Sequence, residues 1–222
     1  RDHQILFHTD AVQAYAQIPI SMQQYHIDLL SASAHKFHGP KGVGFLYVRD
    51  GVTMPSFIHG GSQERGKRAG TENVAGIVGM AQALVIAAQE MPYTRGKLTR
   101  LRNYFAERVR HEIPNIRLNG HPYKRLPGNV NFSIEGIDAT ALLVLLDEEG
   151  ICASAGSACN TGQTRISHVI EAIRVPENYA AGSVRFTMGR DTTRRDVDAC
   201  VDALKRCVIT VSYTHLRAHE TS

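Results

Sequence analysis

Short apolar runs, each ending in small or polar residues, organise the first part of the chain. They cover residues 4–10 (QILFHTD), 27–33 (IDLLSAS) and 42–50 (GVGFLYVRD), and their length and composition predict buried strands. A glycine-rich loop follows over 59–70. From residue 71 to 91 the sequence predicts a long helix, with a threonine at the expected N-cap.

The character of the sequence changes after residue 92. The second part predicts helices over 97–113, 138–150 and 192–208, strands over 115–120, 128–136 and 182–189, and a further helix before the last strand. This order predicts an α/β fold in two parts. We expect residues 1–92 to form the end of a larger sheet domain and residues 93–210 to form a smaller α+β domain.

Composition excludes several classes of function. Hydrophobic residues make up 43% and charged residues 21%, an ordinary balance for a soluble protein. No apolar run approaches the length of about 20 residues that is needed to span a bilayer, so we expect no membrane contact. The net charge of +4 is spread along the chain, and its densest basic stretch, 63–70 (QERGKRAG), suits one small anion better than nucleic acid.

The four cysteines indicate a reducing compartment. None lies in a CxxC pair, so we expect neither a structural zinc site nor a thioredoxin-like site. Reduced thiols are typical of cytoplasmic proteins, and we expect this localisation. Cys152, Cys200 and Cys207 stand in apolar surroundings and are expected in the core.

Both ends of the chain look artificial. A strand-like run begins almost at once after Arg1, so we expect the chain to begin inside a domain. The stretch 211–221 (VSYTHLRAHET) interrupts the amphipathic helix without a cap and resembles the translation of a transposase sequencing adapter. We therefore treat 211–222 as a non-native tail and leave it out of the fold prediction.

The segment 31–42 (SASAHKFHGPKG) places Lys36 between His35 and His38. On its own, this segment suits a solvated polar loop. It gains a chemical meaning if Lys36 forms a Schiff base with a carbonyl-bearing cofactor, and we then expect Lys36 to be partly buried beside cationic neighbours. His38 is expected to be structural.

Other residues of the first part suit the remaining groups of a pyridine-based cofactor. Asp10 is a candidate partner for the ring nitrogen, and Gln13 for the phenolic oxygen. Ser33, His35 and Thr71 are candidates for binding its phosphate. Plainer roles stay open, with Asp10 as a strand-end cap and Thr71 as an ordinary helix cap.

Two residues of the second part suit catalysis and substrate binding. Cys159 lies among small and polar residues in SAGSACN, which suits a thiolate presented to a substrate; a merely small, flexible loop residue is the alternative. Arg185 lies mid-strand between two apolar residues. Either a bound carboxylate or a structural ion pair accounts for that charge.

Five motifs in this order resemble one family. They are HTDAVQA, SASAHKFHGPKG, HGGSQERGKRAGT, SAGSAC and GSVRFTMGR, and together they resemble cysteine desulfurases of the NifS/IscS type. That family belongs to the class-V aminotransferase superfamily of fold-type-I enzymes, which use pyridoxal 5'-phosphate (PLP). The resemblance implies that residues 1–92 are the C-terminal part of a large domain with a mixed, mostly parallel sheet. The resemblance covers residues 1 to about 208 and implies a fragment that lacks the N-terminal part of the large domain, so we expect this chain alone to be inactive.

The resemblance implies a role for each candidate in turn. Lys36 matches the lysine that carries PLP and moves protons, with His35 beside it. Asp10 and Gln13 match the contacts to the pyridine nitrogen and the phenolic oxygen. Ser33 and His35 match the phosphate contacts, and no resident metal is implied.

Three further roles concern the partners. Thr71 matches a threonine that reaches the PLP phosphate of the other subunit, which implies a homodimer. Arg185 matches the arginine that holds the substrate carboxylate. Cys159 matches the nucleophile that takes sulfur from L-cysteine, leaving L-alanine and a persulfide for an iron–sulfur scaffold or a tRNA-thiolation relay. The same thiolate is a candidate transient ligand of an iron–sulfur cluster.

Two alternatives and two departures accompany the resemblance. A selenocysteine lyase or another class-V PLP enzyme is the nearest alternative, and a catalytically silent scaffold-binding relative is the alternative from another class. The joint presence of Lys36, Cys159 and Arg185 argues against the silent relative. Ala34 stands where many relatives carry glycine, and the run NTGQTRISHV after Cys159 is atypical, which leaves the sulfur acceptor open.

Overall fold

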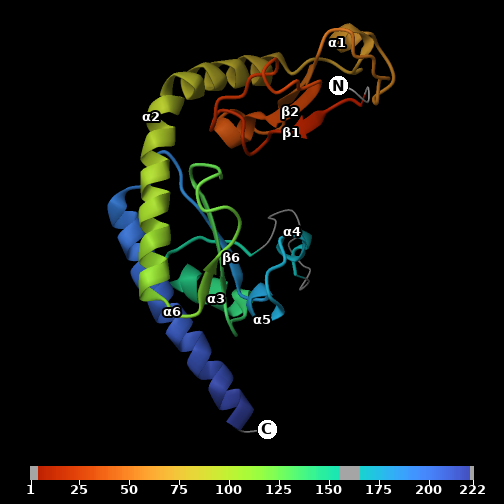
Figure 1. Cartoon of the computed structure of the whole chain (residues 1–222). Helices are drawn as coiled ribbons and strands as arrows, with labels where there is room; N and C mark the ends of the chain where they lie inside the picture. Colours follow the sequence, from red (N-terminus) through yellow and green to blue (C-terminus); the bar gives the residue numbers. More distant parts are fainter. Residues whose placement is uncertain (1–4, 156–165, 221–222) are drawn as a thin grey trace. The chain divides into compact units, whose positions relative to one another are not determined.

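The computed structural model describes residues 5–155 and 166–220, with side chains as far as Ser212. The chain divides into two compact units, Arg1–Thr94 and Arg95–Ser222 (Figure 1). The division lies inside the long helix α2 (Val74–Glu112), whereas the sequence placed it at residues 92/93.

The first unit contains a mixed sheet of three short strands. Strand β1 (His8–Asp10) pairs in parallel with β2 (Leu29–Ser33), and β2 pairs antiparallel with β3 (Gly44–Val48). The 3₁₀ helix η1 (Ala34–Phe37) follows β2 directly, and the short helix α1 (Gln63–Gly66) lies in the glycine-rich segment. The three predicted strands are therefore confirmed, each shorter than its apolar run.

Helix α2 differs from the prediction in two ways. The sequence predicted separate helices over 71–91 and 97–113, but one helix continues through Pro92. Proline removes one backbone donor without ending the helix here. The predicted cap was also wrong: Asn73 caps the helix, since its Oδ1 accepts a hydrogen bond from the Gly76 backbone N–H at 3.0 Å, and Thr71 lies before the helix.

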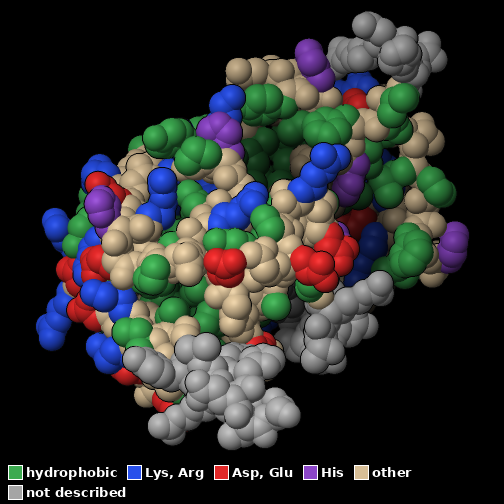
Figure 2. Space-filling model, turned by 60° about the horizontal axis from the view of Figure 1, so that its bottom comes forward, with side chains coloured by type: hydrophobic (Ala, Val, Ile, Leu, Met, Phe, Trp, Pro, Cys, Tyr) green, Lys and Arg blue, Asp and Glu red, His purple; other side chains and the backbone are tan. Residues whose placement is uncertain are grey.

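The apolar N-terminal part of α2 corrects the expectation about membrane-spanning runs. By length and composition α2 would suffice to cross a bilayer, with a mean hydropathy of 1.5 over an 18-residue window of which 6% is buried. One such helix is weak evidence for a membrane span, because core helices of soluble proteins pass the same test. Exposed hydrophobic side chains lie among lysine and arginine side chains on the face drawn in Figure 2.

The second unit packs helices against one face of an antiparallel sheet. The strands β4 (Ile116–Leu118), β5 (Asn129–Ile134) and β6 (Ser183–Thr187) lie in that order in the sheet. The sequence predicted all three strands but not their order in space. The helices are α3 (Ala139–Glu148), α4 (His168–Ala172), α5 (Glu177–Ala180) and α6 (Arg194–Glu220). The four-residue α5 was not predicted.

The sheet of the second unit has one apolar and one polar face. Val130 pairs with Phe186 and Phe132 with Val184, and all four side chains are buried in the core with α2, α3 and α6. The alternate positions are polar, with Asn131 paired to Arg185. Because successive side chains in a strand point to opposite faces, the polar set must lie on the far side from this core.

Helix α6 continues past the position where the sequence suggested an interruption. Its backbone is helical as far as Glu220, and Val211 is only 4% exposed in the core of the second unit. The predicted break of the helix at residue 211 is therefore wrong.

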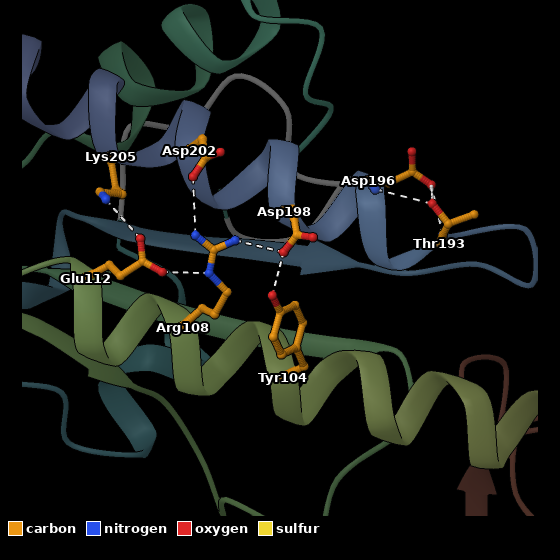
Figure 3. A network of polar contacts seen from close by, with 8 residues as sticks. All are labelled: Tyr104, Arg108, Glu112, Thr193, Asp196, Asp198, Asp202 and Lys205. Carbon is orange, nitrogen blue, oxygen red and sulfur yellow. Dashed lines mark hydrogen bonds and ion pairs between the residues drawn. The ribbon is translucent and has the colours of Figure 1, made fainter.

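An ion-pair network joins α2 to α6 (Figure 3). Arg108 donates to Glu112 Oε1 at 2.6 Å and to Asp198 Oδ1 at 2.8 Å. The Tyr104 hydroxyl also donates to Asp198, and Lys205 donates to Glu112 Oε2 at 2.9 Å. Hydrogen bonds from Arg108 and then Lys205 lower the pKa of Glu112 from 4.5 to about 2.

The turn after η1 fixes the course of the chain beyond Lys36. His38 adopts a left-handed conformation (φ 65°), and the backbone N–H groups of His38 and Gly39 both donate to the Ala34 carbonyl. A Cβ atom on Gly39 would lie 2.9 Å from the Ala34 Cβ and 3.1 Å from the Ala34 carbonyl oxygen. Glycine is therefore required for this close approach.

The Glu112 network predicts a pH-dependent loss of stability. Because the folded-state pKa is lowered, Glu112 stabilises the fold above pH 4.5, and this contribution disappears as the pH falls toward 2. In the full-length protein, Glu112→Gln should lower the thermal unfolding midpoint at pH 7, and the difference from wild type should shrink below pH 4.5. The exposed Glu107, which has no ion pair among the described residues, provides the control Glu107→Gln, with no such pH-dependent difference. A constant difference at every pH would contradict the role of the charge.

The turn geometry predicts opposite effects for two glycine substitutions. Gly39→Ala should destabilise the full-length protein by about 1–3 kcal/mol, because the backbone of the turn must move. Gly96→Ala should leave stability unchanged or raise it by up to about 1 kcal/mol, since helix interiors favour alanine over glycine. A Cβ on Gly96 would meet only the Arg100 guanidinium, at 3.5 Å. Denaturant unfolding measures both, and equal effects would refute the steric argument.

Candidate functional site

The parallel pairing of β1 and β2 places several candidate residues at one sheet edge. Asp10 is the last residue of β1 and pairs with Ser31, and Ser33 is the last residue of β2. Lys36 follows in η1. In open α/β sheets, ligands bind outside the carboxyl ends of the parallel strands, which is the edge where these residues gather.

Local hydrogen bonds orient two of these groups. The Ser33 Oγ and His35 Nδ1 atoms form a hydrogen bond of 2.8 Å, which fixes the imidazole beside the end of β2. Asp10 Oδ1 accepts from the Val12 backbone N–H at 2.9 Å, so Asp10 does act as a cap at the strand end. Its second carboxylate oxygen has no partner among the described residues and stays available to a ligand.

Lys36 is exposed, and its ammonium has no hydrogen bond or ion pair with any residue that the structure describes. The expected partial burial is therefore wrong for this chain. The physical reason is that the sheet of the first unit has only three described strands. Within this unit, no described element covers the Lys36 side chain. An unengaged amine at this edge is nevertheless the group that Schiff-base chemistry needs.

Two further candidates, Gln13 and Thr71, lie outside the strands and helices. Gln13 is exposed in the turn after β1, and Thr71 is exposed in the segment before α2. No described hydrogen bond joins either side chain to Asp10, Ser33 or Lys36. Their proposed contacts to a cofactor stay predictions.

The second unit contains a cavity of about 870 Å³ on the polar side of its sheet. Arg185 from β6 and Asn131 from β5 line it, together with Asn119, Arg125 and residues of α4. Ala155 and Ile166, the residues that flank the undescribed segment, also line it. Cys159 itself lies outside the described residues, so its predicted role is not addressed by this geometry.

Arg185 is half-buried in this cavity without an acidic partner. Its Nη2 donates to Ser154 Oγ at 2.8 Å, and among the described residues it forms no ion pair. The structural ion pair considered from the sequence therefore finds no support in the described part of the chain. An arginine in such a position matches a carboxylate ligand, which the guanidinium binds through two parallel hydrogen bonds.

A buried polar network lies on the same face of the sheet as Arg185, and sequence reasoning missed it. Asn119 is 3% exposed, and its Nδ2 donates to Asn131 Oδ1 at 2.6 Å and to Ser133 Oγ at 2.7 Å. Ser133 and Ser183 share a hydrogen bond of 2.6 Å. The alternation of polar and apolar residues in NVNFSI signals a polar strand face, but not that Asn119 would join it.

The described cysteines divide by burial. Cys207 is buried in the core and Cys200 is partly buried against it, as predicted. Burial raises the pKa of both thiols, that of Cys200 to about 12. Cys152 is exposed, so its predicted core position is wrong. Within the part of the chain that the structure describes, no three His, Cys, Asp or Glu side chains gather as a metal site would require.

Comparison with known proteins shows the family. The model of the class-V aminotransferases matches residues 1–200. The cysteine desulfurase IscS of Dictyoglomus turgidum is 49% identical over 208 residues, which are 94% of this chain and 53% of that protein. The chain thus spans about half the length of the curated relatives it matches.

Solved structures agree with the sequence comparison. A NifS-like protein superposes with a TM-score of 0.83 at 35% identity, covering 94% of this chain and 54% of that one. SspA, solved in complex with cysteine, gives a TM-score of 0.65 at 31% identity over 86% of this chain and 52% of that one. These likenesses confirm the predicted fold as part of a PLP fold-type-I enzyme. The chain belongs to the class-V aminotransferase family.

Proposed function

We propose that this chain supplies about half of a PLP-dependent cysteine desulfurase, which converts L-cysteine to L-alanine and leaves sulfur as a persulfide on Cys159. The observation that carries the proposal is the sheet edge in the first unit. There, a lysine amine with no partner in the described part of the chain lies beside an oriented hydroxyl–imidazole pair. The similarity to proteins named cysteine desulfurase IscS supports the choice of reaction.

The residues at this edge fit PLP chemically. Enzymes of this family are PLP-dependent. The amine of Lys36 suits the aldehyde, the free oxygen of the Asp10 carboxylate suits the protonated ring nitrogen, and the oriented pair of Ser33 and His35 suits the phosphate. When bound, PLP supplies an electron sink for the substrate Cα.

The chain's own residues account for the remaining steps. Arg185 binds the substrate carboxylate, and the Lys36 amine removes and returns the proton at Cα. The Cys159 thiolate attacks the substrate Sγ, so that an S–S bond forms while the Cβ–Sγ bond breaks. The electron pair of the broken bond passes to Cβ, which takes up a proton and becomes the methyl group of L-alanine.

The partners belong to the same proposal. The complex of SspA with cysteine supports L-cysteine as the substrate. The exposed Thr71 suits contact with the cofactor phosphate of a second subunit, so we propose a homodimer. The persulfide would pass to an iron–sulfur scaffold or another sulfur acceptor. The free thiols Cys152, Cys200 and Cys207 are consistent with the cytoplasm.

The full-length protein provides the first test. After incubation with L-cysteine, mass spectrometry should find one additional sulfur on Cys159, and L-alanine should be released. Lys36→Ala should abolish the absorption band of bound PLP, and Cys159→Ala should retain the band but lose the persulfide. PLP binding without a persulfide would move the function to another class-V enzyme, and faster release of selenide from selenocysteine would favour a selenocysteine lyase. No PLP binding would refute the proposal.

Arg185, which has no acidic partner among the described residues, generates a second prediction. Arg185→Gln should raise the KM for L-cysteine by about 100-fold, because a charge-assisted pair of hydrogen bonds to the carboxylate is lost. Arg117, a strand arginine that does not line the cavity, provides the control. Steady-state kinetics of Arg117→Gln should show a KM within about twofold of wild type. Equal effects of the two substitutions would argue against carboxylate binding by Arg185.

A further inference from the structure

We propose that Ser154 is the positioning residue that holds the Arg185 guanidinium ready for the substrate carboxylate. The inference rests on the proposed function, because it assumes an amino-acid substrate whose carboxylate Arg185 binds.

Ser154 contacts Arg185 through both its backbone and its side chain. The two residues form an isolated antiparallel bridge, with the Arg185 N–H donating to the Ser154 carbonyl at 2.7 Å and the Ser154 N–H donating to the Arg185 carbonyl at 3.1 Å. The Ser154 Oγ accepts from Arg185 Nη2 at 2.8 Å. The backbone bridge therefore holds the serine in place, and the hydroxyl holds the guanidinium.

No other described side chain performs this task. Asn131 lies directly across the sheet from Arg185, but its Oδ1 accepts from Asn119 and it shares no hydrogen bond with the guanidinium. The Arg185 Nε and Nη1 atoms have no partner among the described residues. Ser154 thus fixes one nitrogen and leaves the other donors of a cavity-lining arginine for a carboxylate.

The need for such a contact follows from the flexibility of arginine. A free arginine side chain samples many rotamers, and part of this conformational entropy is lost when it binds a ligand. A guanidinium already held by a hydroxyl loses less of this freedom on binding, so substrate affinity rises. Because the carboxylate does not react, this interaction is the same in the ground state and the transition state. Its loss should raise KM and leave kcat nearly unchanged.

The test uses the full-length holoenzyme and two ligands that differ only in the carboxylate. L-alanine carries the carboxylate, and ethylamine is the same molecule without it. Each is titrated against the absorption of the bound cofactor in wild type, Ser154→Ala and Ser154→Thr. Ser154→Ala should weaken L-alanine binding about tenfold, the loss of one hydrogen bond to a charged group, and leave ethylamine binding within about twofold. Ser154→Thr keeps the hydroxyl and should restore L-alanine binding.

A double mutant separates action through Arg185 from a general structural effect. In an Arg185→Gln background, Ser154→Ala should cause no further loss of L-alanine affinity, because the group that it positions is already gone. The KM for L-cysteine in Ser154→Ala should rise by about the same tenfold, with kcat within about twofold of wild type.

Several results would overturn the inference. These are unchanged L-alanine binding in Ser154→Ala, an equal loss for L-alanine and ethylamine, or a full additional loss in the Arg185→Gln background. Failure of the proposed function has a different signature. The wild type would then release no L-alanine from L-cysteine, whereas a wild type that turns over L-cysteine with an unaffected Ser154→Ala variant would refute only the role of Ser154.

Discussion

The two-faced sheet of the second unit is the constraint on which its site depends. Burial of Val130, Phe132, Val184 and Phe186 against the helices fixes the register of β5 and β6. Phe105 of α2 reinforces this packing through edge-to-face contacts with both phenylalanines. A slip of one residue would expose the apolar set, so the same burial that stabilises the unit also places Arg185 on the polar face.

Three arginines of the second unit show how partners decide the role of a charge. Arg102 is buried and donates to the backbone carbonyls of Arg125 and Leu126, where it supports the loop before β5. Arg108 is surrounded by acidic side chains and joins two helices. Arg185 has one serine hydroxyl and no acid within the described residues. Only an arginine without a protein carboxylate has its charge free for a substrate carboxylate.

In the first unit, strand pairing rather than a large core places the candidate residues. Its core is small, and its parallel strands serve mainly to bring the end of β1 beside the end of β2. The tight turn at His38 and Gly39 then directs the chain away immediately after Lys36. A short helix held between a strand end and a glycine turn gives the lysine a defined backbone position while its side chain remains exposed.

The sequence by itself determined the strands, the order of elements and the family, because strand alternation and the residues of the five motifs are local properties. It also identified Lys36 and Arg185 by residue type and context. Only the tertiary structure decided that α2 is one helix through Pro92, that Cys152 is exposed, and that Arg185 has no acidic partner among the described residues. The pairing of Ser154 with Arg185 joins positions 31 residues apart. Such pairing depends on how the chain returns to β6, which no local pattern encodes.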